Sequence, residues 1–254
     1  MGSPRIRLAC IADLAIWRAL FEHPQNPSGL VALPYYNKSI SEAICESSLE
    51  WVLDSGAFTA HASGEEIKLQ DFIDVCKKAL DSKNPPAEIF ALDTIGDPAS
   101  SYQNAVEMKR QGLDVIPAFH IGSPQDDLER ICDGWPKIAL GGVAGATAKG
   151  VRSDWFEACF ARVWPKKVHG FGVAGRTDVL KFPWHTTDAS TWQSGPARFK
   201  RWHQYGNTQV HGELLTGKRD WAVHLKGEVD YFMKLEQQAQ FKWRNQMAQL
   251  TEEC

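Results

Sequence analysis

The chain has 254 residues, of which 43% are hydrophobic and 23% are charged, and its formal net charge is −3. This composition is ordinary for a soluble globular protein of one large domain or two small ones, and no apolar run approaches the roughly 20 residues that span a bilayer. The negative net charge does not favour nucleic-acid binding as a whole, so a nucleic-acid partner has to meet a local basic patch.

The first residues make a poor signal peptide, because the segment 8–16 that follows the N-terminal arginines is interrupted by Asp13. Six cysteines stand alone at positions 10, 45, 76, 132, 159 and 254, without the close pairs of a zinc site or the pattern of a disulfide framework. We therefore expect reduced thiols, no membrane span and a cytoplasmic location.

Short apolar runs and periodic segments alternate along the chain. The runs predict strands over 5–12, 30–36 (weakened by Pro34), 51–54, 88–93, 113–120, 137–140, 167–173 and 182–188. Helical periodicity predicts helices over 65–82, 98–112, 124–134, 153–163, 176–181 and 228–247. Asp97 is the expected N-cap of the second of these helices, and Gly112 is its stop.

This alternation predicts an α/β fold with a buried parallel sheet, and the number of units favours a (β/α)8 TIM-type barrel over 1–195. A doubly wound sheet is the alternative, but the nearest approach to its glycine fingerprint, residues 170–175, comes too late in the chain. Residues 196–254 form a C-terminal extension, basic and aromatic and then helical, whose apolar stripe packs on the barrel or on a partner.

Polar or glycine residues end several predicted strands. They are Asp54, Asp93, His120, Gly141–Gly142, Phe171–Gly172 and Asp188. Active sites of such barrels lie at the C-terminal strand ends, so these residues are expected to converge on one mouth. Each has a plainer interpretation: the aspartates as turn or cap residues, His120 as a satisfied core histidine, and the phenylalanines as core.

Five segments together resemble the tRNA-guanine transglycosylases, and more closely the short phage-type relatives that insert 7-deazaguanines into DNA. The resemblance runs from about Arg5 to Trp192 and is carried by Asp54-Ser55-Gly56-Ala57-Phe58, Leu92-Asp93, Leu140-Gly141-Gly142-Val143-Ala144, Gly170-Phe171-Gly172 and Asp188. It implies a pentosyltransferase that exchanges guanine in nucleic acid for a free 7-deazaguanine base.

The resemblance also implies a role for each matching residue. Asp188 is the nucleophile that forms a covalent glycosyl intermediate, and Asp54 is the general acid/base. Asp93 accepts from guanine N1 and N2, and the Gly142 amide donates to O6. The implied base-binding residues are Ser55, Phe58, Asp93, His120, Gly141, Gly142, Phe171 and Val173, with Phe58 and either Phe171 or Val173 as stacking walls.

The chemistry fits these residue types independently. Exchange with retention needs two displacements, hence one ionised carboxylate beneath the sugar and a second group that shuttles a proton at the base. A carboxylate and a backbone amide match the donors and the acceptor on the edge of guanine. Reaching a base within a duplex requires flipping it out, at a cost on the order of a few kcal/mol.

The chain also departs from the family pattern. The cysteine-rich zinc site of the tRNA enzymes is missing, since Cys254 alone lies beyond Cys159, and this favours DNA over tRNA as substrate. His120 stands where the family often has glutamine, and Gly145-Ala146-Thr147 stand where the tRNA enzymes place an acid, which leaves the 7-substituent open. No metal and no cofactor beyond the base itself is expected, and a phage origin implies the host cytoplasm.

A basic stretch over 198–226 is the expected nucleic-acid-binding surface. It holds six basic residues against two acidic ones, including Arg198, Lys200, Arg201, Lys218 and Arg219, interleaved with Trp202, Tyr205 and Trp221. A solvated basic face packed on the barrel is the alternative. The rival functions are a tRNA-guanine transglycosylase, a non-catalytic nucleic-acid-binding barrel subunit and a carbohydrate-active barrel, and a homodimer is left open.

Overall fold

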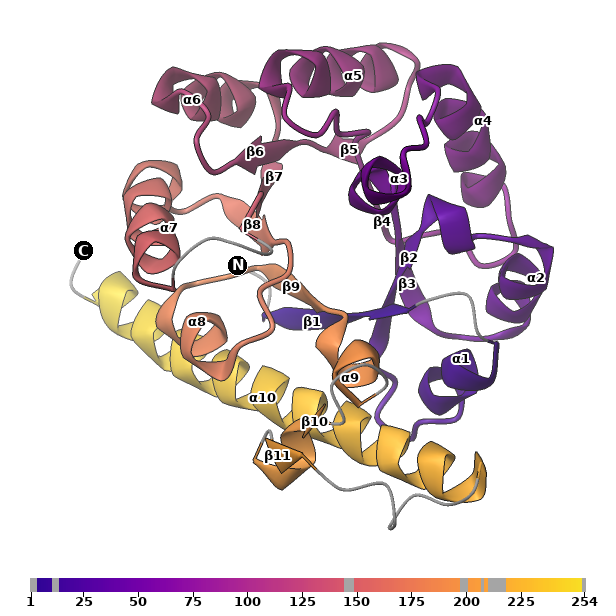
Figure 1. Cartoon of the computed structure of the whole chain (residues 1–254). Coiled ribbons are helices and arrows are strands. Elements are labelled where there is room, and N and C mark those ends of the chain that lie inside the picture. The colour runs from indigo at the N-terminus through magenta and orange to yellow at the C-terminus, as the bar shows by residue number, and fades with distance from the viewer. Residues whose placement is uncertain are drawn as a thin grey trace.

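Parallel strands joined by helices form a barrel in the computed structural model, which describes residues 4–10, 14–143, 149–196, 201–206, 208–209 and 218–252 (Figure 1). The strands of its main sheet are β1 (Arg5–Cys10), β2 (Ser28–Ala32), β3 (Glu50–Asp54), β4 (Glu88–Phe90), β5 (Val115–Ile116), β6 (Ala118–His120), β7 (Lys137–Gly141), β8 (Lys167–Gly170) and β9 (Thr186–Ala189). They lie in the order β5-β4-β3-β2-β1-β9-β8-β7-β6, and every pairing is parallel.

The strands at the two ends of this order, β5 and β6, are consecutive in the chain and are separated only by Pro117. The break occurs at Pro117 because proline has no N–H to donate to a neighbouring strand. β5 pairs with β4 through Ile89 and Val115, while β6 pairs with β7 through Ala118 and Ala139. The Pro117 carbonyl still accepts from the Ala139 amide at 2.8 Å. β5 and β6 thus act as one strand that closes the barrel, which confirms the predicted TIM-type fold over the doubly wound alternative.

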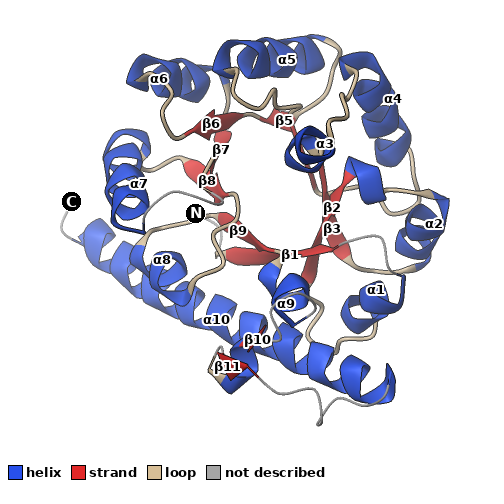
Figure 2. Ribbon diagram, viewed as in Figure 1, coloured by secondary structure: helices blue, strands red, loops and turns tan. Residues whose placement is uncertain are grey.

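Helices surround the strands (Figure 2). They are α1 (Leu14–Phe21), α2 (Lys38–Glu46), α3 (Ala57–Ser63), α4 (Leu69–Leu80), α5 (Pro98–Arg110), α6 (Gln125–Gly134), α7 (Lys149–Val163), α8 (Arg176–Lys181), α9 (Thr191–Ser194) and α10 (Lys218–Glu252), with short 3-10 turns η1 (Leu33–Tyr35) and η3 (His203–Tyr205). The Asp97 cap is confirmed, since its Oδ1 accepts from the Ser100 amide at 3.0 Å. Sequence periodicity missed α1, α2 and α3, which are seven to nine residues long.

The barrel interior is layered along the strands, because alternate residues of each strand point inward. A middle apolar layer holds Leu30, Val52, Phe90, Ile116 and Ala139, packed with Ala9, Ala118 and Phe171. Two residues earlier on their strands lies a charged layer of Arg7, Glu50, Glu88 and Lys137. Its ion pairs join Arg7 to Glu50, Arg7 to Glu88 at 3.4 Å, and Lys137 to Glu88 at 2.6 Å.

The layer two residues after the middle apolar layer faces the opening at the C-terminal ends of the strands. By the same alternation it contains Asp54 on β3, His120 on β6, Gly141 on β7 and Asp188 on β9. The mouth at the C-terminal strand ends is therefore polar, while the interior below it is filled by apolar side chains and ion pairs.

The long helix α10 packs along the outside of the barrel against β1, α1, α8 and α9 (Figure 1). The stripe residues Val229, Phe232, Met233 and Ala239 are buried, so this face of the helix packs on the barrel. Glu236 Oε2 accepts from the Ile6 amide of β1 at 2.7 Å and so ties the helix to the sheet. Within the described part of the chain, no helix combines the length and apolar character that crossing a membrane requires.

Candidate active site

Asp54 closes β3 and leads into a turn that only glycine can make. Its Oδ2 accepts from the Gly56 amide at 3.0 Å. Gly56 has a φ of 71°, and a Cβ at that position would overlap Cδ of Pro34. The strand end, the turn and the first residues of α3 are thereby fixed as one unit, with Asp54 at the mouth.

Burial raises the pKa of Asp54 to about 7, against the lowering effect of the Gly56 hydrogen bond. The negative charges of Asp93 and Asp188 raise it further, so three carboxylates from β3, the loop after β4 and β9 share one electrostatic environment. A carboxyl group that titrates near neutrality can both give and take a proton, which is what acid/base chemistry needs.

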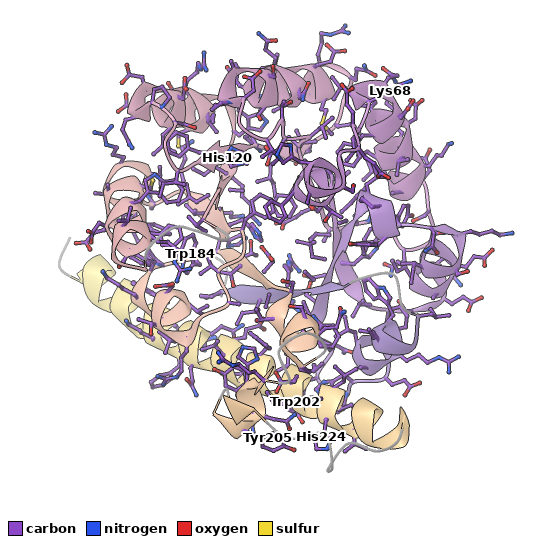
Figure 3. All side chains as sticks on the ribbon, viewed as in Figure 1. Lys68, His120, Trp184, Trp202, Tyr205 and His224 are labelled. Atoms are coloured by element: carbon purple, nitrogen blue, oxygen red, sulfur yellow. The ribbon has the colours of Figure 1, made fainter. Side chains whose placement is uncertain are left out.

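Asp93 and His120 form a pair across the mouth. His120 Nε2 lies 3.2 Å from Asp93 Oδ2. Burial lowers the pKa of His120, but the hydrogen bond and the charge of Asp93 outweigh it and leave the pKa raised. His120 is satisfied by this contact with Asp93, and it lies at the edge of the barrel opening (Figure 3).

Asp188 at the end of β9 is held by the β8–α8 turn. Its Oδ1 accepts from the Gly172 amide at 2.7 Å, and Gly172 has a φ of 67°. His169 Nε2 lies 3.4 Å from the same oxygen. The side chain of Asp188 is 12% exposed, so the carboxylate is recessed but reachable from the mouth.

Glycine and phenylalanine shape the space beside these carboxylates. A Cβ on Gly141 would lie 3.2 Å from Cδ2 of His120 and 3.3 Å from Cδ2 of Phe171, so glycine keeps these rings close. Phe171 rests on Phe90, with ring centroids 4.7 Å apart. Gly142 follows with a φ of 76°. One wall of the mouth is therefore aromatic.

Three other predicted base-binding residues lie differently. Phe58 on α3 is 64% exposed, so its ring presents an apolar face to solvent. Val173 is buried in the core between sheet and helices, where it packs behind Gly170, so of these two residues Phe171 is the one beside the mouth. Ser55 is also buried, and its Oγ accepts from the Ala57 amide at 3.4 Å at the start of α3.

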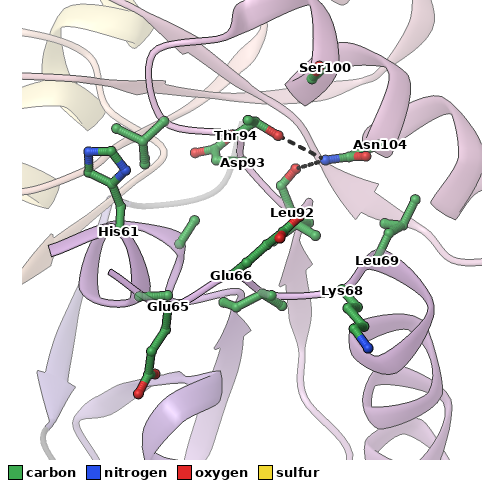
Figure 4. A pocket seen from close by; sticks show the side chains of 14 residues that line it. His61, Glu65, Glu66, Lys68, Leu69, Leu92, Asp93, Thr94, Ser100 and Asn104 are labelled. Atoms are coloured by element: carbon green, nitrogen blue, oxygen red, sulfur yellow. Dashed lines mark hydrogen bonds between the residues drawn. The ribbon is translucent and has the colours of Figure 1, made fainter. Parts of the chain in front are cut away.

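A cavity of about 530 Å³ adjoins the mouth at Asp93 (Figure 4). The Asn104 Nδ2 group donates to the Leu92 carbonyl at 3.1 Å and to Thr94 Oγ1 at 3.3 Å, which fixes the loop after β4. The polar side chains around the cavity come from the α3–α4 segment and from this loop and α5: His61, Glu65, Glu66, Lys68, Asp93, Thr94, Ser100 and Asn104.

The predicted nucleic-acid-binding surface is only partly described by the structure. Arg198 and Lys200 lie outside the described residues, as do the side chains of Lys218 and Arg219 on α10. Arg201 is exposed on β10 (Arg201–Trp202), which pairs with β11 (Thr208–Gln209). Trp202 is fully buried, so it is not a surface for stacking bases.

Tyr205, by contrast, is 43% exposed beside the same hairpin. Its hydroxyl lies 2.8 Å from His224 Nδ1, and Figure 3 shows Trp202, Tyr205 and His224 gathered beside α10. This cluster anchors the hairpin to the helix.

Sequence reasoning placed Gly172 at a strand end but not its amide on Asp188, and it missed His169. His169 could have been found from strand alternation, because it precedes the inward-facing Phe171 by two residues. As for metals, no group of three or more His, Cys, Asp or Glu side chains is arranged to hold an ion within the residues described.

Comparison with known proteins identifies the fold. No protein-family model matches the chain, and no curated protein matches it. Two variants of the tryptophan synthase alpha-subunit from the hyperthermophile Pyrococcus furiosus match with TM-scores of 0.54 and 0.56 at 15% and 16% identity, over 92% of this chain and 98% of theirs. A chain of the tryptophan synthase complex from that organism matches with a TM-score of 0.54 at 15% identity, over 91% and 98%. At these identities the likeness establishes a TIM-type barrel and carries no activity with it.

Proposed function

We propose that this protein is a transglycosylase that exchanges guanine in nucleic acid, with DNA preferred over tRNA, for a free 7-deazaguanine base. The observation that carries the proposal is the convergence of Asp54, Asp93 and Asp188 at one mouth. The Asp188 carboxylate accepts a hydrogen bond from the Gly172 amide, and the pKa of Asp54 is raised to about 7. The motif resemblance supplies the substrate class, and the fold is compatible with it.

In the first displacement, a carboxylate oxygen of Asp188 attacks the anomeric carbon of the nucleotide. The carbon–N9 bond breaks, its electron pair leaves with guanine, and the protonated Asp54 gives the departing base a proton. The sugar is then held as an ester of Asp188. This step uses the two carboxylates in the roles that their surroundings favour.

In the second displacement, the incoming base loses its N9 proton to Asp54, and N9 attacks the same carbon. The ester bond breaks and its electrons return to the Asp188 carboxylate. Two inversions give net retention, and Asp54 ends protonated as it began, so the protons balance over the cycle.

Binding of the base is assigned to Asp93, the Gly142 amide and Phe171. A carboxylate that accepts from N1 and N2 and an amide that donates to O6 select guanine-like bases. Because His120 already occupies Oδ2 of Asp93, an incoming base has to share Asp93 with His120 or displace it. Phe171, braced by Phe90, offers the aromatic face that offsets part of the cost of unstacking.

Incorporation of radiolabelled guanine tests the activity, with duplex DNA, single-stranded DNA and tRNA assayed side by side. We expect label in DNA, and its loss by at least about 10³-fold in Asp188→Asn because the nucleophile is removed. Asp97→Asn is the matched control, since asparagine also caps a helix and Asp97 lies at the start of α5.

Label in tRNA alone would replace the DNA assignment. Guanine binding by the wild type without any exchange would favour a non-catalytic barrel subunit. An active Asp188→Asn protein would refute the assigned nucleophile.

A further inference from the structure

His169 is a fully buried histidine that faces the barrel interior from β8. Its ring lies between two phenylalanines, with centroids 4.5 Å from Phe90 and 4.8 Å from Phe171. Nδ1 lies 2.8 Å from Oγ1 of Thr186 on the neighbouring strand β9. The ring is thus fixed by packing on its faces and by a hydrogen bond on one nitrogen.

The other nitrogen, Nε2, is buried and makes no hydrogen bond within the described residues. The carboxylate oxygen Oδ1 of Asp188 lies 3.4 Å away. Leaving a buried polar atom unpaired is costly, and contacts of catalytic groups are often longer before the substrate binds.

Thr186 and Asp188 together determine which nitrogen carries the proton, because the Thr186 hydroxyl can either donate to Nδ1 or accept from it. If Thr186 donates to Nδ1, the proton of a neutral ring sits on Nε2 and points at Asp188. The reverse tautomer would set the Nε2 lone pair against an anionic oxygen, which is repulsive. Burial lowers the pKa of His169, although Asp188 raises it, while Lys137 lowers it and Glu88 raises it from the charged layer below. The lowered pKa favours a neutral ring, and the position of Asp188 beside Nε2 favours the tautomer with the proton on that nitrogen.

We infer that His169 is a positioning residue: with the Gly172 amide it anchors Oδ1 of Asp188 and leaves Oδ2 as the attacking oxygen. Oδ1 faces both N–H groups, whereas Oδ2 accepts no hydrogen bond from the residues that the structure describes. The assignment of Oδ2 as the attacking oxygen rests on the proposed function, in which Oδ2 forms the bond to the anomeric carbon as the base departs. The contact between His169 and Asp188 does not depend on that function.

Kinetics of His169→Leu and His169→Gln test the inference in the exchange assay. Glutamine can place an amide N–H near the position of Nε2, and leucine cannot. We expect kcat to fall about 10- to 100-fold in His169→Leu, the rate equivalent of a hydrogen bond to a charged group, with the KM for the base unchanged. His169→Gln should recover a large part of kcat. Equal losses in both variants would overturn the inference.

Thr186→Val provides a milder variant in case the buried leucine prevents folding. It removes the hydroxyl that donates to Nδ1 in the inferred tautomer and keeps the shape of the side chain. We expect a smaller fall in kcat than in His169→Leu, again without a change in KM. A Thr186→Val protein with wild-type kcat would count against the inference.

Nitrogen-15 NMR of histidine-labelled protein gives a readout that needs no activity. The wild type should show the Nε2–H tautomer at His169, and Thr186→Val and Asp188→Ala should each shift it toward a mixture. An Nδ1–H tautomer in the wild type refutes the inference even if exchange occurs. A wild type that has the Nε2–H tautomer but exchanges no base refutes the proposed function and leaves the His169–Asp188 pair intact.

Discussion

Two aspartates with the same side chain behave differently because of what surrounds each carboxylate. Asp188 receives a backbone N–H on Oδ1 at 2.7 Å, and His169 lies beside that oxygen. Asp54 also receives one backbone N–H, but burial and two neighbouring carboxylates raise its pKa to about 7. In the proposed exchange this difference in surroundings would let Asp54 act as the acid and Asp188 as the nucleophile.

The raised pKa of Asp54 predicts a pH-dependent effect of Asp54→Asn on stability. A carboxyl group whose pKa is higher in the folded state destabilises that state once pH rises through the unfolded and then the folded value, because ionisation is easier in the unfolded chain. The ordinary pKa is 3.8 and the folded value about 7. We therefore expect Asp54→Asn to raise Tm clearly at pH 8 and little at pH 4.

Thermal unfolding at the two pH values checks this, with Asp97→Asn as the control for loss of a carboxylate at a helix cap. The same change in Tm at pH 4 and at pH 8 would show that Asp54 ionises in the folded protein as it does in the unfolded chain. Activity of Asp54→Asn should fall by about 10²- to 10⁴-fold at both pH values, the usual contribution of a general acid/base.

Turns place the site residues at the level of the secondary-structure elements. The β3–α3 turn through Ser55 and Gly56, the Gly141–Gly142 pair after β7 and the Gly172 turn after β8 each follow a strand end directly. Gly56, Gly142 and Gly172 have positive φ, which L side chains rarely adopt. The amides of Gly56 and Gly172 donate to Asp54 and Asp188, and a Cβ on Gly56 would also collide with Pro34. The side chains of the site depend on these turns for their positions.

Gly56→Ala tests this dependence. A left-handed φ costs an L-residue about 1–2 kcal/mol, and crowding against Pro34 adds about 1–3 kcal/mol. Gly64→Ala is the matched control, because Gly64 ends the same helix with a φ of 74°, but a Cβ added there would meet nothing within 4 Å. Urea unfolding should show a loss of about 2–5 kcal/mol for Gly56→Ala and about 1–2 kcal/mol for Gly64→Ala. Equal losses would contradict the role of Pro34.

At the scale of the whole molecule, the long C-terminal helix α10 completes the outer layer of the barrel. α10 packs against β1, α1, α8 and α9, so the last described helix covers the first strand of the barrel. Phe232 is 1% exposed on this helix, whereas Phe241 is 73% exposed. One face of the helix therefore packs on the barrel, and the face that carries Phe241 is open to solvent.

Phe232→Ala should accordingly reduce the free energy of unfolding by about 3–5 kcal/mol, the cost of removing a buried phenylalanine. Phe241→Ala on the same helix should change it by less than about 0.5 kcal/mol. Denaturant unfolding followed by both circular dichroism and tryptophan fluorescence measures this. A separate early transition for α10 in either protein would contradict its integration into the barrel.

Sequence periodicity predicted the barrel because its strands are short, apolar and regularly spaced, and it placed Asp54, His120, Gly141 and Asp188 at strand ends. It missed α1 and α2, which are eight and nine residues long and offer few turns for a period to emerge. It could not place Trp202 or Val173, because their burial depends on packing against distant segments. The pairing of Asp93 with His120 is likewise a contact between two strand ends, and no local pattern encodes it.

The filled interior below the mouth has a kinetic consequence for the proposed exchange. Apolar side chains and ion pairs fill the barrel from the middle layer to the N-terminal strand ends. The departing and the arriving base must therefore both pass through the mouth at the C-terminal strand ends. Guanine has to leave before its replacement enters, and the glycosylated enzyme waits between the two events with an empty base site. Both bases then compete for that single form of the enzyme, which is the condition for ping-pong kinetics with guanine as a competitive product inhibitor of the incoming base.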